Sequence, residues 1–182
     1  MEIRKGAVNW QLVAALLLII AGTALRLLPH IPNFAPVGAI ALFGGAVLGW
    51  RLAVWLPLAL MIFSDLFIGF YPGIAFTWAG FLLVALFGML LRRMGLAGRI
   101  VIGGAASGVL FFVVSNFGVW LTSGMYVHAF DGLVQCYAMA LPFFRVSLIA
   151  DLFYSAVIFG LYELVLYAVR VRQAVRAATP LK

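Results

Sequence analysis

Long apolar runs that contain no charged residue are the feature that most constrains this chain. Leu12–Gly22 and Ile100–Val114 are two examples, and both are continuous rather than alternating. Overall, 66% of the residues are hydrophobic and 9% are charged, whereas a water-soluble domain carries about 25% charged residues. A transmembrane β-barrel would require short alternating segments. The continuous runs therefore predict an all-α integral membrane protein.

Six apolar segments approach the length of about 20 residues that a helix needs to cross a hydrocarbon core of about 30 Å. They predict a six-transmembrane-helix bundle that forms a single membrane domain over residues 1–182, with a basic cytoplasmic tail at 170–182. The second segment is the shortest and contains Gly44-Gly45, so it either spans with help from Asn33–Ala35 or forms a broken or re-entrant element. The predicted spans are Trp10–Leu28, Pro36–Trp50, Leu52–Phe70, Ile74–Leu91, Ile100–Leu121 and Phe143–Val169.

The distribution of Lys and Arg sets the expected orientation, because cytoplasmic loops are enriched in both. Six spans with cytoplasmic N- and C-termini place ten of the twelve basic residues inside and leave Arg26 and Arg145 near the outer face. Five spans with an external N-terminus place nine of the twelve inside, so the rule hardly separates the two arrangements. Both place Arg92–Arg99 inside and Thr122–Pro142 outside, and we prefer six. The net charge of +7 then reflects the flanks of the spans, and we expect no nucleic-acid partner.

Polar and ionisable side chains inside the spans are expected to have a structural or functional role. Placing a charged side chain in a membrane helix costs roughly 2.5–3.5 kcal/mol on insertion scales. Asp65 lies near the outer end of the third span, and Asp151 lies about two turns into the last. Ser147 precedes Asp151 by one helical turn on the same face, and Asn116 precedes Trp120 in the same way. All these residues are expected in the outer half of the bilayer.

Two hypotheses explain these residues. In the structural one, Asp65 and Asp151 form ion pairs with Arg26 and Arg145, and Asn116 forms a hydrogen bond between helices. In the functional one, they line a ligand pocket that opens outward and is completed by aromatic residues of the external loops. The predicted substrate-binding residues are Asn33, Phe34, Asp65, Asn116, Trp120, Tyr126, Tyr137, Arg145 and Asp151.

The single cysteine, Cys136, lies in the predicted external segment. A lone cysteine is most often a small buried hydrophobe, but as a thiolate it could ligate the metal of a metal-containing substrate. The sequence lacks the motifs of zinc proteases, serine hydrolases and phosphate-binding loops. We therefore expect no catalytic activity, no resident cofactor and no ATP-driven transport by this chain alone.

Four runs of the sequence are distinctive: Pro32–Ala39, Ser115–Trp120, Cys136-Tyr137 with Pro142–Arg145, and Asp151–Tyr154. On these runs the chain resembles a family of uncharacterised bacterial inner-membrane proteins, some members of which are labelled as cobalt or vitamin transport proteins. The resemblance extends over Leu25–Leu164. It implies a multi-pass protein of the bacterial cytoplasmic (inner) membrane.

At a coarser level the chain is similar to the substrate-capture subunits (S-components) of energy-coupling-factor (ECF) transporters. The similarity implies six helices, cytoplasmic termini, an outward pocket and an ECF energising module as partner. Such subunits commonly carry Ala-x-x-x-Ala in the first helix for docking on that module, whereas here Trp10–Leu28 has no such pair and the nearest one, Ala35 and Ala39, lies just beyond it. One relative binds cobalamin through a cysteine–cobalt bond, and by analogy Cys136 would take that role.

The expected function is therefore a substrate-binding membrane subunit or small transporter that takes up a vitamin-like or metal-containing nutrient, with cobalamin or a related corrinoid as the first candidate. The alternative is a structural or assembly partner in a membrane protein complex, which binds no small molecule. The lipid bilayer is a partner in either case.

Overall fold

The computed structural model describes residues 9–178 of the chain, and within that range the chain is helical and contains no strand. Five helical stretches are long and apolar enough to cross a membrane. The chain is therefore a multi-pass membrane protein. The elements are α1 (Trp10–Leu27), α2 (Val37–Phe43), the π-helix η1 (Gly44–Leu48), α3 (Trp50–Ile68), α4 (Ile74–Leu90), the 3₁₀ turn η2 (Leu91–Arg93), α5 (Leu96–Gly98), the π-helix η3 (Arg99–Gly103), α6 (Gly104–Thr122) and α7 (Phe130–Ala178).

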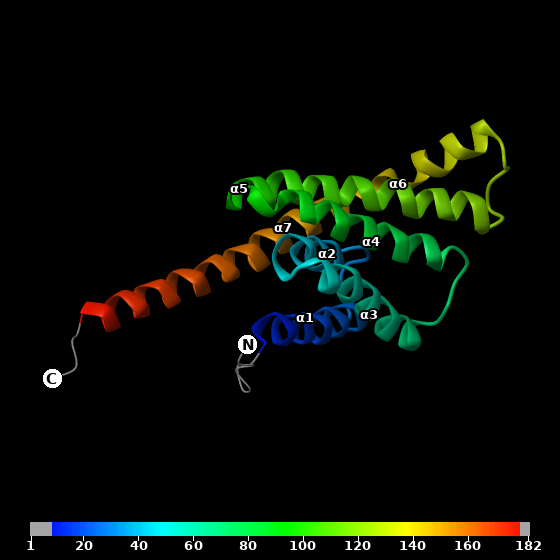
Figure 1. Cartoon of the computed structure of the whole chain (residues 1–182). Helices are drawn as coiled ribbons and strands as arrows, with labels where there is room; N and C mark the ends of the chain where they lie inside the picture. The colour runs from blue at the N-terminus through cyan, green and yellow to red at the C-terminus, as the bar shows by residue number, and fades with distance from the viewer. Residues whose placement is uncertain (1–8, 179–182) are drawn as a thin grey trace.

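The chain runs back and forth through the bundle: η1 continues α2, α5 and η3 lead into α6, and successive helical stretches run in opposite directions (Figure 1). The start of α1, the turn between η1 and α3, the α4–α6 connection and the end of α7 lie at one end of the bundle. We call this the basic end, because Arg51, Arg92, Arg93, Arg99 and Arg170 belong to it. The connections 28–36, 69–73 and 123–129 lie at the opposite end. The chain thus passes between the two ends of the bundle in five long helical stretches and one short one, α2 with η1.

The second segment is shorter than a full span and lies inside the bundle. Its two parts, α2 and η1, comprise seven and five residues, which at a 1.5 Å rise cover only about 18 Å of a hydrocarbon core of about 30 Å. Every residue of α2 is buried. Of the two alternatives for Pro36–Trp50, the structure has the broken element: a short central α-helix followed by a π-helix, which ends at Gly49 with a φ of 96°. Because the surrounding helices shield it, this element does not need the length of a lipid-exposed helix.

Two glycines let this central element pack directly against the backbone of α4. A Cβ on Gly45 would lie 1.8 Å from the Ala85 carbonyl oxygen, and a Cβ on Gly88 would lie 2.4 Å from the Leu42 carbonyl oxygen. No side chain fits at either contact, so small residues determine how closely the two elements approach, as is common for helices in membranes.

The last helix differs most from the prediction. It begins at Phe130 rather than Phe143, so most of the predicted external segment Thr122–Pro142 is helical, and only Ser123–Ala129 connects α6 to α7. Pro142 lies inside the helix, where neighbouring groups in a membrane bundle can compensate for its missing N–H. The helix has 49 residues, roughly 70 Å at the usual rise. It is far longer than a bilayer core. Residues up to Glu163 contact the bundle, and the C-terminal part that follows extends alone beyond it (Figure 1).

The buried core and the outer surface of the bundle are both apolar. In the core, the Phe43 ring packs edge-on against Phe159 and Tyr162, with centroid distances of 5.3 and 5.4 Å. On the outside, large apolar side chains such as Ile20 and Phe67 are 67% and 75% exposed. A surface of this kind is suited to contact with lipid rather than water.

Candidate functional site

A cavity of about 500 Å³ lies in the half of the bundle opposite the basic end. Its wall comes from the end of α1, the 28–36 connection, the start of α2 and α4, the second half of α6 and the middle of α7. Four of its residues, His30, Asn33, Tyr71 and Phe143, are exposed, so the cavity reaches the surface. The lining residues are Arg26, His30, Asn33, Ala35, Val37, Tyr71, Thr77, Phe81, Phe111, Phe112, Ser115, Asn116, Ala140, Phe143, Phe144, Ser147 and Asp151.

Asp151 is the buried acidic group of the cavity wall, with 5% of the residue exposed. Its carboxylate fits between two glycines: a Cβ on Gly38 would lie 2.2 Å from Oδ1, and a Cβ on Gly108 would lie 3.6 Å from Oδ2. The buried Ser107 hydroxyl lies beside the carboxylate. Both glycines belong to helices that cross α7 here, so the fold leaves room for a charged group at this crossing.

No basic side chain forms a salt bridge with Asp151 in the part of the chain that the structure describes. The ion pair with Arg145 that the structural hypothesis predicts is therefore not formed. Arg145 is exposed on α7, outside the cavity wall. A carboxylate buried at membrane depth without a cation is costly, and this makes Asp151 the residue of the cavity that most needs an explanation.

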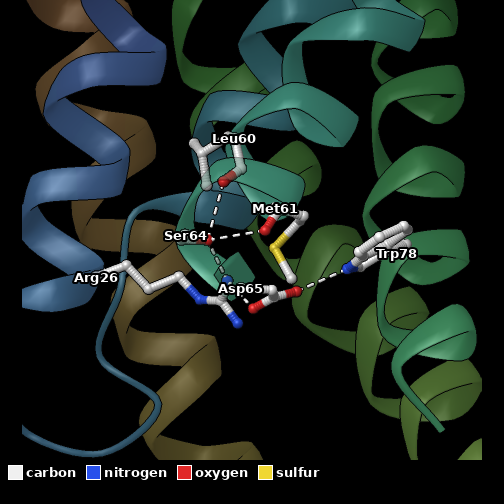
Figure 2. Close-up of polar contacts among 6 residues, drawn as sticks. All are labelled: Arg26, Leu60, Met61, Ser64, Asp65 and Trp78. Atoms are coloured by element: carbon white, nitrogen blue, oxygen red, sulfur yellow. Dashed lines mark hydrogen bonds and ion pairs between the residues drawn. The ribbon is translucent and has the colours of Figure 1, made fainter. Parts of the chain in front are cut away.

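Asp65, by contrast, is fully satisfied by a polar cluster that joins α1, α3 and α4 (Figure 2). Arg26 Nη1 donates to Asp65 Oδ1 at 2.6 Å, and the indole Nε1 of Trp78 donates to Oδ2 at 2.7 Å. Arg26 also donates to the hydroxyl of Ser64, which in turn donates to the Leu60 carbonyl at 2.9 Å. The predicted pairing of Asp65 with Arg26 is confirmed. Asp65 is completely buried and lies outside the cavity wall.

Aromatic pairs form much of the remaining wall. Phe81 of α4 stacks on Phe111 of α6 with ring centroids 4.2 Å apart and planes 17° from parallel. Phe112 of α6 lies 4.7 Å from Phe144 of α7 in a tilted arrangement. These contacts join α4 to α6 and α6 to α7, and they give the cavity flat apolar faces next to its polar groups.

Two predicted asparagines lie in the cavity wall. Asn116 donates from Nδ2 to the Phe112 carbonyl at 2.8 Å, within α6. Asn33 adopts a φ of 65° in the 28–36 connection, a left-handed conformation that asparagine tolerates better than most residues. The turn is closed by the hydrogen bond from Phe34 N to Ile31 O at 2.9 Å. Asn33, Asn116 and Asp151 are thus the three predicted binding residues that the structure brings together around one cavity.

The other predicted residues lie elsewhere. Phe34 packs against Phe153 and Tyr154, with centroid distances of 5.8 and 5.5 Å. Trp120 donates from Nε1 to the Val127 carbonyl at 3.0 Å and lies against His128. Tyr126 belongs to the same α6–α7 connection and does not line the cavity.

Cys136 and Tyr137 lie on the first turns of α7, behind the cavity wall. The Cys136 side chain is buried, and its thiol lies 3.5 Å from the Asn116 carbonyl. The Tyr137 hydroxyl donates to the Val113 carbonyl at 2.6 Å, and its ring contacts Phe112. No group of three or more His, Cys, Asp or Glu side chains in the described residues is arranged to hold a metal ion.

Several lining residues were not among the predicted binding residues. Ser147 carried a signal, because it lies one turn before Asp151, and Ser115 is adjacent to Asn116. Arg26 was expected in the ion pair and was not among the predicted binding residues, although it also lines the cavity. The phenylalanines carried no signal, since an apolar chain gives no pattern that separates a cavity-lining ring from one that faces lipid.

Residues 7–175 of the chain match a family described as a family of unknown function (DUF6580). No curated protein and no solved structure matches the chain. Since the matched region covers nearly the whole sequence, the chain belongs to this family of unknown function, DUF6580.

Proposed function

We propose that this protein is a substrate-binding membrane subunit or small transporter that takes up a vitamin-like nutrient through the cavity described above. A volume of about 500 Å³ falls within the roughly 300–1,000 Å³ typical of small-molecule sites. Flat aromatic walls with a few polar anchors are also typical of such sites. The observation that carries the proposal is Asp151, a buried carboxylate that opens onto this cavity and has no cationic partner among the described residues.

The charge distribution supports uptake from the outside toward the cytoplasm. Basic connections favour the cytoplasmic side of a membrane, and the cavity lies in the half of the bundle opposite the basic end. In the proposed orientation the cavity faces the outside of a bacterial cytoplasmic membrane, with both termini inside. A binding subunit placed in this way would capture its substrate before transfer across the bilayer.

Within the nutrient class, the geometry favours a compact vitamin-like molecule over cobalamin or another corrinoid. Cys136 is buried and absent from the cavity wall, so a ligand in this cavity would not reach its thiol. A direct cysteine–cobalt bond therefore receives no support from the position of Cys136. Cobalamin stays in the test panel because the proposal concerns uptake of a nutrient and not one compound.

Under this proposal the partner is an ECF energising module, but the Ala-x-x-x-Ala pair nearest the first helix, Ala35 and Ala39, is not placed for docking. Ala39 is completely buried within α2, and Ala35 lines the cavity. A module that docks on this protein would have to use another surface. The outer face of α1 carries exposed Leu17 and Ile20 and is the simplest candidate.

Ligand-induced thermal stabilisation of the detergent-purified protein tests the proposal. The panel comprises water-soluble vitamins, cobalamin, cobinamide and divalent cobalt and nickel. A ligand that binds only the folded form stabilises it by about 2.7 kcal/mol at a hundredfold excess over its Kd. The expected result is a shift in Tm with one compound that is lost in Asp151→Asn or Asn116→Ala.

Asp131→Asn is the matched control, because Asp131 lies exposed in the first turn of the same helix, outside the cavity. It removes the same charge, so the shift in Tm should be retained. If no compound of the panel stabilises the protein, or if Asp151→Asn and Asn116→Ala both keep the full shift, the proposed function is wrong.

A role as a structural or assembly partner is the second candidate, and the length of α7 favours it. Beyond the bundle this helix exposes Leu164, Val165 and Tyr167 at 64%, 61% and 66%. A partner subunit could cover this apolar segment. Co-purification in a mild detergent would then yield a stoichiometric protein partner, and the partner would be lost when Leu164 and Val165 are replaced by serine.

A further inference from the structure

The charged groups around the cavity leave one negative charge unbalanced. Arg26 lines the cavity, but its positive charge is neutralised by Asp65 at 2.6 Å. Asp151 also lines the cavity and forms no salt bridge among the described residues. The cavity therefore has a net charge of −1 when Asp151 is ionised and His30 is neutral. A cationic ligand would balance this charge, and an anionic ligand would add to it.

Two polar side chains of α6 in the cavity wall have acceptor oxygens available. Asn116 donates one of its two amide N–H groups to the Phe112 carbonyl at 2.8 Å, and its Oδ1 has no donor among the described residues. Ser115 donates its hydroxyl hydrogen to the Phe111 carbonyl at 2.7 Å, so its oxygen can only accept. The Asp151 carboxylate accepts hydrogen bonds as well. These three lining residues from α6 and α7 offer acceptors that suit the N–H donors of a cationic group.

The aromatic walls add a second attraction for a positive charge. Phe112 belongs to the same wall as Asn116 and pairs with Phe144 at 4.7 Å. The face of an aromatic ring attracts ammonium and guanidinium groups, and this attraction is stronger where water is excluded. The same rings give an apolar body a flat surface to pack on.

We infer that the ligand of this cavity is an organic monocation with N–H donors, such as a primary or secondary ammonium or a protonated nitrogen heterocycle, attached to a flat apolar body. This inference rests on the proposed function and specifies its substrate class. The positive group would form an ion pair with Asp151 and donate to Asn116 Oδ1 and Ser115 Oγ. The apolar body would pack on Phe111, Phe112 and their partners. The free N–H groups of Arg26 would bind a hydroxyl or carbonyl oxygen elsewhere on the ligand.

The test uses two sets of small probes that share a ring system and differ in charge. One set is phenethylamine, 2-phenylethanol and 3-phenylpropionate, and the other is tryptamine, tryptophol, tryptophan and indole-3-propionate. Affinities are measured by calorimetry and by thermal stabilisation on the full-length protein in detergent. We expect the amines to bind at least about tenfold more tightly than the alcohols, the zwitterion and the carboxylates.

Substitution of Asp151 then identifies the group that is responsible. Asp151→Asn should weaken amine binding roughly 30-fold, the loss expected when one partner of a buried charge pair is removed. The same substitution should leave the alcohols within about threefold, which shows that the variant is folded. Asp131→Asn, an exposed change of the same kind on the same helix, should alter neither class.

Each alternative result has one meaning. Equal or tighter binding of the alcohols, carboxylates or tryptophan, or an amine affinity unchanged by Asp151→Asn, would overturn the inference. If in that case a vitamin of the broader panel still binds in a manner that depends on Asn116, the proposed function stands and only the charge class of its ligand is wrong. If neither the probes nor the panel bind, both proposals fail together.

Discussion

Asp151 and Gly38 are so close that the carboxylate occupies the space a side chain on Gly38 would need. A Cβ built on Gly38 would lie 2.2 Å from Asp151 Oδ1 and 2.7 Å from Ser107 Oγ. Neither oxygen has room to withdraw easily, because both residues are buried between α2, α6 and α7. The buried central element α2 and the acidic group of the cavity are therefore fitted to each other.

Gly38→Ala should displace Asp151 and lower both folding stability and ligand binding. Inserting a methyl group into a well-packed interior costs about 1–3 kcal/mol, and we expect a loss of that size from thermal unfolding in detergent. Gly108→Ala should be milder, since its Cβ would lie 3.2 Å from Leu148 Cδ1 and 3.6 Å from Asp151 Oδ2. Equal melting temperatures for Gly38→Ala and the parent protein would contradict the packing described here.

Removing the Arg26 side of the buried ion pair should be strongly destabilising. Arg26→Gln leaves the fully buried Asp65 with only the indole N–H of Trp78, and breaking a buried pair from one side costs about 3–5 kcal/mol. Replacing Arg26 and Asp65 together by methionine should recover much of this loss, because no isolated charge is left. The measurement is thermal unfolding of the single and double variants.

Glu163→Gln serves as the control for this experiment. Its pair with Arg99 spans 3.7 Å, and the Glu163 side chain is 35% exposed, so its loss should cost less than about 1 kcal/mol. If Arg26→Gln proves as mild as Glu163→Gln, the ion pair of Figure 2 does not hold α1 to α3.

The contact between the central element and α4 should not tolerate any side chain. Gly45→Ala would place a methyl group 1.8 Å from the Ala85 carbonyl oxygen, and backbone cannot move aside as a flexible side chain can. We expect a loss of at least about 2 kcal/mol or failure to accumulate in the membrane. Gly160→Ala is the matched control, because nothing lies within 4 Å of a Cβ at that position. Because alanine has a higher helix propensity than glycine, Gly160→Ala should leave the stability of the protein unchanged or slightly increased.

Cysteine labelling tests the proposed orientation of the bundle. In a Cys136→Ala background, Asn33→Cys should react with a membrane-impermeant maleimide in intact cells, since Asn33 is exposed at the end opposite the basic end. Gly95→Cys, in the α4–α6 connection, should react only after the cells are opened. The parent protein should react slowly, because Cys136 is buried. The reverse pattern at Asn33 and Gly95 would place the cavity on the cytoplasmic side.

Much of the fold follows from hydropathy alone. The predicted first, third and fourth spans agree with α1, α3 and α4 to within two residues at each end. The start of α7 could not be predicted in this way, since Asp131, Gln135 and Pro142 are typical of a loop. In the structure this segment packs on α6 through Cys136 and Tyr137, and these tertiary contacts outweigh its weak local preference.

The most useful signal for the site was the free-energy cost of placing a polar side chain inside an apolar membrane helix. Asn116 and Asp151 were expected to converge because each is expensive inside an apolar helix, and both line the cavity. The same reasoning did not separate Asp65 from Asp151, because the difference depends on which arginine lies within reach in three dimensions. Trp120 was also expected to line the pocket, because it lies one turn after Asn116 on the same face. In the structure its indole N–H donates instead to the Val127 carbonyl of the α6–α7 connection.

The continuity of α7 has a mechanical consequence. Asp151 lies inside this helix, and no proline occurs between Asp151 and its end at Ala178. The intervening stretch is about 40 Å long, so a tilt of about 5° at the cavity displaces the far end by roughly 3 Å. A change in the tilt of α7 at Asp151 would therefore be enlarged at the basic end, where the end of the helix projects from the bundle.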